Sequence, residues 1–129
     1  MKLRFVDHAT VERLLPMATC MDLMAGALAA LERDEGINPL RTIMWLPGRV
    51  GALGTMPGYL ATTPGLAVKV ITVFQGNDPN EVGSHQGFVI VFDPHNGSPK
   101  AVVDGGAITA IRTAAVSGVA TRLLSRADA

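Results

Sequence analysis

The sequence predicts an α+β domain, and three observations carry this prediction. Apolar residues recur at helical spacing in the first third of the chain. Short β-type runs separated by Gly, Pro and Asn turns fill the middle, and the helical period returns at the end. The β-type runs follow one another without helices between them, which favours an antiparallel or mixed sheet. The expected order is N-terminal helices, a sheet, and a long closing helix.

The N-terminal part predicts a strand and two helices. "LRFVD" is typical of a short strand, and Asp7 or Thr10 can cap the helix "ATVERLL" that follows. A longer helix is expected after Pro16, over about 18–33. Gly36 and Pro39 in "EGINP" should end it. Four apolar residues at three- and four-residue spacing are expected in the core: Met21, Met24, Leu28 and Leu31.

The central runs predict the strands of the sheet. "DPHNGSPK" joins two of them as a hairpin, with Asn96-Gly97 supplying positive φ. The closing helix is expected over about 107–125, where small residues allow close approach to the sheet. The stretch 75–87, "QGNDPNEVGSHQG", is a long polar loop, and loops of this length are usually functional or mobile. The predicted strands are "RTIMWLP", "GALGTMP", "GLAVKVITVF", "GFVIVFD" and "KAVVD".

Composition excludes some classes of protein. The 129 residues suffice for one domain, and 11 basic residues balance 11 acidic ones, so neither nucleic acid nor an anionic membrane is an expected partner. Cys20 is the only cysteine, which excludes an internal disulfide and predicts a buried structural thiol in a reducing, cytoplasmic setting. Charged residues interrupt any N-terminal signal peptide. Pro16 and Asp22 make the apolar stretch 14–31 a poor membrane span.

Lys69 is the most unusual residue of the predicted sheet. Its strand, 65–74, is apolar on both faces, and the chain has only three lysines. Burying an ammonium depresses its pKa or requires a carboxylate or ligand partner. The alternative is that the stem packs while the ammonium reaches solvent at a sheet edge.

Two arginines and a histidine are further candidates. Arg112 lies early in the closing helix beside threonines, an arrangement suited to a carboxylate or phosphate; alternatively it pairs with Asp104 or Asp93. Arg41 opens an apolar strand and, taken alone, is typical of a solvated strand end. His85, in "SHQG", lies where a loop meets a strand, a common place for pocket residues.

Several kinds of site are disfavoured. The three histidines and one cysteine show no metal-ligand spacing, so no metal site is predicted. "GRVGALG" is not a dinucleotide fingerprint, and no phosphate loop or nucleophile elbow occurs.

"GLAVKVITVF", "SHQG", the "FDP" hairpin and "TAIRTAA" occur in the order and spacing of the ornithine cyclodeaminase and mu-crystallin family, which the chain resembles along its whole length. The resemblance implies a substrate-binding and dimerising α+β domain at 1–129, an N-terminal segment that is incomplete by comparison with the family. The family's Rossmann domain, which binds NAD or NADP, is absent from these residues. We therefore expect the chain alone to be inactive and not to bind a dinucleotide tightly.

The resemblance also assigns roles to residues. Lys69 matches the family lysine that acts in proton transfer, and Arg41 and Arg112 match arginines that bind the substrate carboxylate. Met56 and His85 match substrate-pocket positions. Thr113 and Ala114 match positions near the cofactor's nicotinamide and phosphates.

One departure bears on the substrate. Ornithine cyclodeaminases of the family carry a glutamate shortly before the "MP" turn, whereas this chain has "LGTMP". The pattern is nearer to members that reduce cyclic ketimines or act as amino-acid dehydrogenases, exchanging hydride with the α-carbon of an amino or imino acid. The alternatives are a non-catalytic ligand-binding and dimerisation module, as in mu-crystallin, and a plain structural domain. A homodimer in the cytoplasm is expected.

Overall fold

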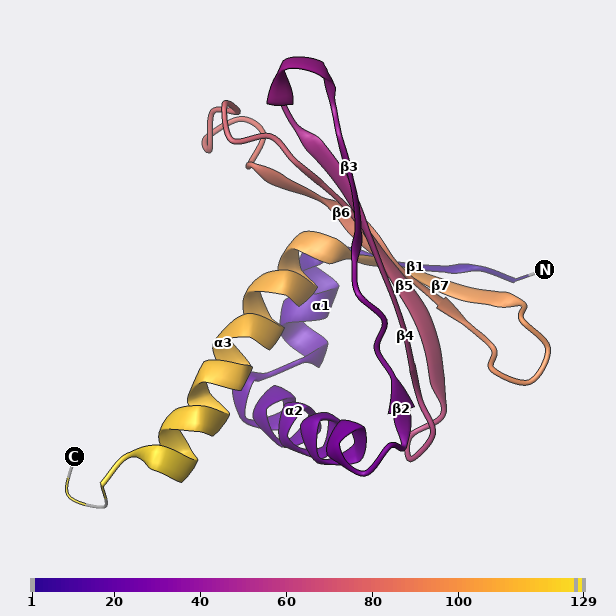
Figure 1. The fold of residues 1–129 in the computed structure, drawn as a ribbon, viewed down its shortest axis with the longest axis vertical. Helices are drawn as coiled ribbons and strands as arrows, with labels where there is room; N and C mark the ends of the chain where they lie inside the picture. Colours follow the sequence, from indigo (N-terminus) through magenta and orange to yellow (C-terminus); the bar gives the residue numbers. More distant parts are fainter. Residues whose placement is uncertain (1, 127, 129) are drawn as a thin grey trace.

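The computed structural model describes residues 2–126 and 128 and has helices packed on one side of a twisted sheet (Figure 1). The predicted α+β class and element order are confirmed. A short 3-10 turn, η1 (Pro47–Arg49), adds to them. The helices are α1 (His8–Leu14), α2 (Met17–Glu32) and α3 (Gly105–Leu124), and the strands are β1 (Arg4–Val6), β2 (Gly36–Ile37), β3 (Thr42–Trp45), β4 (Ala52–Leu60), β5 (Gly65–Val73), β6 (His85–Phe92) and β7 (Pro99–Asp104).

The sheet is mixed, as the sequence predicts. The seven strands run in the order β1-β7-β6-β5-β4-β2, and β3 also pairs with β4. β1 pairs with β7 in parallel, while the remaining pairs are antiparallel. The consecutive strands β4 to β7 form the centre, and β5 lies between β4 and β6 with both of its edges hydrogen-bonded.

The helix boundaries lie close to the predicted ones. The Asp7 carboxylate accepts a hydrogen bond from the Thr10 amide at 2.9 Å, so Asp7 caps α1. α2 begins and ends one residue before the predicted 18–33. Its ending differs from the prediction: Asp34 takes the left-handed conformation, with φ of 56°. Gly36 instead lies in β2, where an added Cβ would meet Leu31 Cδ2 at 2.8 Å, so close packing explains this glycine.

The core is small and lies where α2 and α3 meet each other and the sheet. Cys20 is 1% exposed, which confirms the buried thiol, and burial raises its pKa. Leu28 is 48% exposed, so its predicted place in the core is wrong: α2 presents that side to solvent. The buried apolar residues are Val11, Cys20, Ala30, Ala52, Ile71, Ala107, Ala115 and Val119.

The small residues of α3 serve two contacts rather than only the predicted helix-to-sheet one. An added Cβ at Gly118 would meet Met21 Sδ and Cε at 3.0 Å, so this part of α3 packs closely on α2. The close approach to the sheet occurs at the first residue of α3. There an added Cβ on Gly105 would meet the carbonyl carbon and oxygen of Gly87 at 2.7 Å.

Two predicted connections can be compared with the structure. β6 begins at His85, so the polar loop is shorter than the predicted 75–87. The β6–β7 hairpin is present, and its positive φ of 73° belongs to Gly97 alone. Asp93 supports the turn by accepting the His95 amide at 2.8 Å.

α3 is the helix with the greatest likeness to a membrane span, rather than the stretch 14–31. Among the residues that the structure describes, α3 is the one single helix long and apolar enough to cross a membrane, but a core helix of a soluble protein meets the same test. α1 and α2 meet it only if counted together, and they are bent by 81°.

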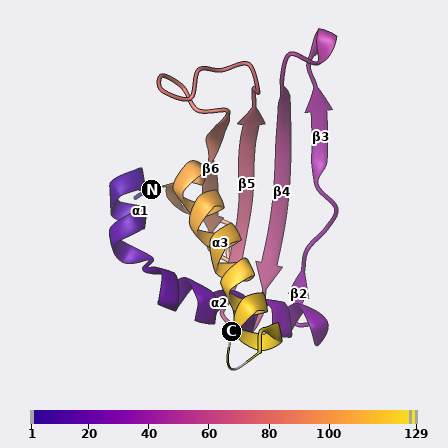
Figure 2. The same ribbon diagram turned by 90° about the vertical axis from the view of Figure 1, so that its left-hand side faces the viewer.

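α3 lies in front of the central strands on one face of the sheet (Figure 2), and the helices leave the other face uncovered (Figure 1). Large apolar side chains on that side are exposed to solvent: Phe5 is 68% and Phe88 44% exposed. Their rings lie edge to face, with centroids 5.9 Å apart. An apolar surface of this kind is typical of an interface.

Candidate functional site

Lys69 lies at the centre of the sheet on the side that faces α3. Because β5 is hydrogen-bonded on both edges, the ammonium does not reach solvent at a sheet edge. Lys69 Nζ instead donates to Thr109 Oγ1 at 3.2 Å, and the side chain is half-buried. The structure therefore places the lysine against the helix rather than beyond the sheet.

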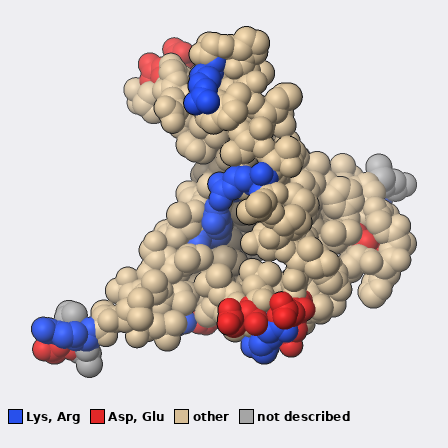
Figure 3. Space-filling view, viewed as in Figure 1, with Lys and Arg blue, Asp and Glu red and all other residues tan. Residues whose placement is uncertain are grey.

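Two arginines act electrostatically on this lysine. Partial burial lowers the pKa of Lys69, and the positive charges of Arg112 and then Arg41 lower it further. Arg112 comes from the third turn of α3, and Arg41 directly precedes β3. Lys and Arg atoms gather in the hollow between the start of α3 and the sheet (Figure 3). We call Lys69, Arg41 and Arg112 the cationic cluster.

The carboxylates that could have paired with Arg112 are occupied elsewhere. Asp104 accepts the Ala107 amide at 2.7 Å and lies 3.2 Å from His8 Nδ1. Asp93 pairs with Lys100 at 2.7 Å, which with the His95 amide lowers the pKa of Asp93. Within residues 2–126 and 128, Arg112 makes no ion pair, so the alternative that it pairs with Asp104 or Asp93 is wrong.

Met56 borders the cationic cluster. It is paired with Lys69 across β4 and β5, and cross-strand partners point to the same side of a sheet. The structure therefore brings this predicted pocket residue next to Lys69 on the same face of the sheet.

A second region lies on the other flank of α3. An open groove of about 680 Å³ runs between the end of the β5–β6 loop and the helix. His85 lines it, and its Nδ1 lies 2.8 Å from Ser84 Oγ. Thr113 and Ala114 line it from α3, so three predicted site residues meet here. The groove is lined by Gly83, Ser84, His85, Gly106, Thr109, Ala110, Thr113, Ala114 and Ser117.

The two regions meet at Thr109. This residue accepts the Lys69 hydrogen bond and also lines the groove. The sequence indicates Thr109 only as one of the threonines beside Arg112, and a threonine in a helix gives no signal of what lies across from it. Only the pairing of a strand position with a helix position 40 residues later reveals the contact.

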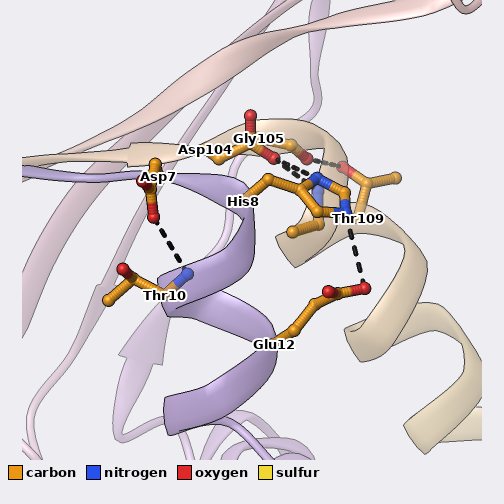
Figure 4. A network of polar contacts seen from close by, with 8 residues as sticks. Asp7, His8, Thr10, Glu12, Asp104, Gly105 and Thr109 are labelled. Carbon is orange, nitrogen blue, oxygen red and sulfur yellow. Dashed lines mark hydrogen bonds and ion pairs between the residues drawn. The ribbon is translucent and has the colours of Figure 1, made fainter.

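A polar network fixes the start of α3 (Figure 4). Asp104 caps the helix, and the imidazole of His8 lies between Asp104 and Glu12, the latter at 3.4 Å from Nε2. The cap could have been predicted from Asp104 directly preceding the "GGA" that opens the helix. The His8 contact could not, because 96 positions separate it from Asp104.

The comparisons with known proteins identify the family and the fold. The chain matches the ornithine cyclodeaminase/mu-crystallin family over residues 2–129. It is 48% identical over 92 residues to the ketimine reductase mu-crystallin of Rattus norvegicus, covering 70% of this chain and 29% of that protein.

Solved structures share the fold closely. One is the Δ1-pyrroline-2-carboxylate reductase of Thermococcus litoralis in complex with NADH and L-proline, with a TM-score of 0.90 and 33% identity over 95% of this chain and 38% of that one. Another is an archaeal alanine dehydrogenase dimer with bound NAD, with a TM-score of 0.90 and 25% identity over 98% and 38%. The chain thus spans well under half the length of these relatives. It belongs to the ornithine cyclodeaminase/mu-crystallin family.

Proposed function

We propose that this chain is the substrate-binding segment of an NAD(P)-dependent reductase that acts on a cyclic ketimine carboxylate. The observation that carries the proposal is the cationic cluster: the positive charges of Arg112 and Arg41 act on Lys69, and the two candidate carboxylates, Asp104 and Asp93, are occupied elsewhere. Such a cluster is repulsive when empty and is neutralised by a small anion. A substrate carboxylate is the ligand that suits it.

The residues of the cationic cluster would have different roles in binding and catalysis. Arg41 and Arg112 would bind the carboxylate, because a guanidinium offers parallel donors that match its two oxygens. Lys69 would deliver a proton to the imine nitrogen as hydride reaches the neighbouring carbon. A depressed pKa makes an ammonium a better proton donor near neutral pH. Met56 would pack against the apolar ring.

The groove would receive the cofactor's reactive end. It is uncharged, lined by hydroxyls and helix backbone, and contiguous with Lys69 through Thr109. A nicotinamide ring with its carboxamide fits such a lining, and the bound dinucleotide would supply the hydride. Thr113, Ala114 and His85 are the residues proposed to contact it. The relatives bind NADH or NAD, but the main dinucleotide contacts would come from outside these residues.

We further propose that the protein is a cytoplasmic homodimer. The uncovered side of the sheet carries exposed aromatic rings that a second copy could cover. An archaeal relative is described as a dimer. Sedimentation of the chain at micromolar concentration should give the dimer mass, and a stable monomer would contradict this.

Turnover tests the proposed function. A complete enzyme containing this segment should oxidise NADH or NADPH in the presence of Δ1-pyrroline-2-carboxylate or its six-membered homologue, and should not release ammonia from ornithine. Lys69→Met should lower kcat by 100-fold or more while KM changes little. Lys100→Met, an exposed lysine, is the control. Release of ammonia from ornithine instead would favour a cyclodeaminase.

A second candidate is a non-catalytic ligand-binding module. It is favoured by the fact that the cationic cluster and the groove both lie within this chain. L-Proline raising the melting temperature of the chain more than L-prolinamide would show carboxylate binding. If the complete protein then binds L-proline but catalyses no reduction of a ketimine carboxylate, this second function holds.

A further inference from the structure

The hydroxyl of Thr109 has its own proton committed to the backbone. Thr109 Oγ1 donates to the carbonyl oxygen of Gly105, four residues earlier, at 2.6 Å. Figure 4 shows this hydroxyl reaching back to Gly105 beside the capped start of α3. A threonine hydroxyl has one proton, so toward Lys69 it can act only as an acceptor.

This arrangement excludes a proton relay through Thr109. A relay would need the hydroxyl to pass its proton on, and its partner is a backbone carbonyl, which does not carry protons onward. The proton that Lys69 donates must therefore come from one of the N–H groups that are not bonded to Thr109. Thr109 holds the lysine without taking part in the transfer.

The same contact limits where the lysine's lone pair can lie. When Lys69 is neutral, the amine has two N–H groups and one lone pair. Because Thr109 has no proton to offer, it takes an N–H, and the lone pair cannot point at Thr109 Oγ1. The other N–H group and the lone pair are left for other partners, and the positive charges of Arg112 and Arg41 act on the same nitrogen.

The acceptor itself is held rigidly. Bonding of Oγ1 to the carbonyl four residues earlier selects one side-chain rotamer of the helical threonine. Gly105 is fixed in turn by its contact with Gly87 and by the Asp104 cap beside it. The position of the lysine nitrogen is thereby fixed relative to the backbone of β6 and α3.

We propose that Thr109 is a positioning residue that anchors the Lys69 nitrogen as an obligatory hydrogen-bond acceptor, so that only the remaining N–H groups or the lone pair of Lys69 are free to meet a ligand of the cationic cluster. The catalytic meaning of this anchor rests on the proposed function, but the anchor itself does not. Thr109 is the only polar partner of Lys69 in the part of the chain that the structure describes. It also opposes the repulsion from the two arginines.

The first test measures the lysine without requiring turnover. The chain has three lysines, so competitive acetylation by trace acetic anhydride, read by mass spectrometry across pH, reports on Lys69 against exposed Lys2 in the same sample. Thr109→Val keeps the side-chain shape and removes the acceptor, so the ammonium loses a hydrogen bond. Lys69 should then label about tenfold faster near pH 8, the ratio that one hydrogen bond to a charged group is worth.

Two further variants make the result specific. Thr109→Ser keeps the hydroxyl and should label as the unaltered chain does. Thr121→Val removes a hydroxyl that makes the same backbone contact, to Ser117 at 2.9 Å, at the far end of α3, and should also change nothing. Identical Lys69 profiles in the unaltered and Thr109→Val chains would overturn the anchor, as would a Ser variant that behaves like Val.

A fold check and an activity measurement complete the design. Cys20 is buried, so its protection from a thiol reagent reports that each variant is folded. If Thr109→Val makes Cys20 reactive, Thr109→Ala is used in its place. In a complete enzyme, Thr109→Val should lower kcat about tenfold with little change in KM, and Thr109→Ser should restore it. A changed labelling profile in a protein without reductase activity would reject the proposed function and leave the anchor standing.

Discussion

The cationic cluster and the groove lie on two sides of the same helix, yet their chemistry is opposite. The cluster combines the half-buried charge of Lys69 with the charges of two exposed arginines that act on it. The groove's lining has no lysine, arginine or carboxylate and offers hydroxyls and backbone instead. The difference indicates that one region is suited to an anion and the other to a neutral, flat, polar group. Thr109 is the residue that belongs to both.

Displacing the start of α3 should damage both regions together. Gly105→Ala places a methyl group 2.7 Å from the Gly87 backbone, which can yield only by moving the helix. We expect a loss of about 3 kcal/mol in the free energy of unfolding, measured by urea denaturation. Gly26→Ala, a mid-helix glycine of α2 with open space around it, should instead stabilise by about 0.7 kcal/mol. Equal effects of the two substitutions would contradict the close contact.

Removing one charge should separate the two regions. In a complete enzyme, Arg112→Leu should raise the KM for the ketimine carboxylate about 50-fold, because a charged hydrogen bond to the carboxylate is lost. The KM for NAD(P)H should change much less. Arg122→Leu, near the other end of α3, where the arginine pairs with Asp22 at 3.3 Å, is the control. A larger effect on the cofactor than on the substrate would mean that the two regions are assigned the wrong way round.

The cap of α3 supports both regions more weakly. Asp104→Ala removes the acceptor of the Ala107 amide and should cost about 1 kcal/mol of stability. Asp104→Asn keeps an oxygen in place and should retain most of the cap. Thermal unfolding of the pair measures the difference. Equal melting temperatures would show that the cap contributes nothing to the fold.

The smallest expected effect is a gain of stability from loss of the lysine. The folded state depresses the Lys69 pKa, so below that lowered pKa the charged lysine costs stability. The cost is lost as pH rises toward the ordinary lysine value of about 10.4, since the unfolded chain then holds more of the proton. Lys69→Met should stabilise the chain at pH 7 on the order of 0.5 kcal/mol, a small value because the ammonium is only half-buried.

The pH dependence of the stability gained by Lys69→Met tests whether the depressed lysine pKa is its cause. Urea denaturation of Lys69→Met and the unaltered chain should give free energies of unfolding that converge above pH 10. Lys100→Met, which removes the surface pair with Asp93, should show no such gain. A Lys69→Met variant that is less stable at pH 7 would mean that the lysine is held by a counter-charge rather than strained by like charges.

Much of this arrangement could be predicted from local patterns in the sequence. The turn residues and periodicities located the strands and α3, and a lysine within an apolar strand drew attention to Lys69 itself. The failures share a cause. Leu28 has the spacing of a core residue, but spacing cannot say what covers a helix face. Asp34 replaced Gly36 at the helix end because the chain needed glycine for packing against Leu31. Thr109 and His8 depend on contacts between distant segments, which no local pattern records.

The parallel pairing of β1 with β7 also has a consequence for the order in which the chain folds. The strands β4 to β7 are neighbours in sequence and can pair by closing short loops, whereas β1 must wait for a partner about 97 residues downstream, from Arg4 to Ala101. Long-range closure of this kind is slow. During synthesis the lysine-bearing sheet can therefore assemble first, and the N-terminal segment can lock the start of α3 only after β7 and the start of α3 have left the ribosome.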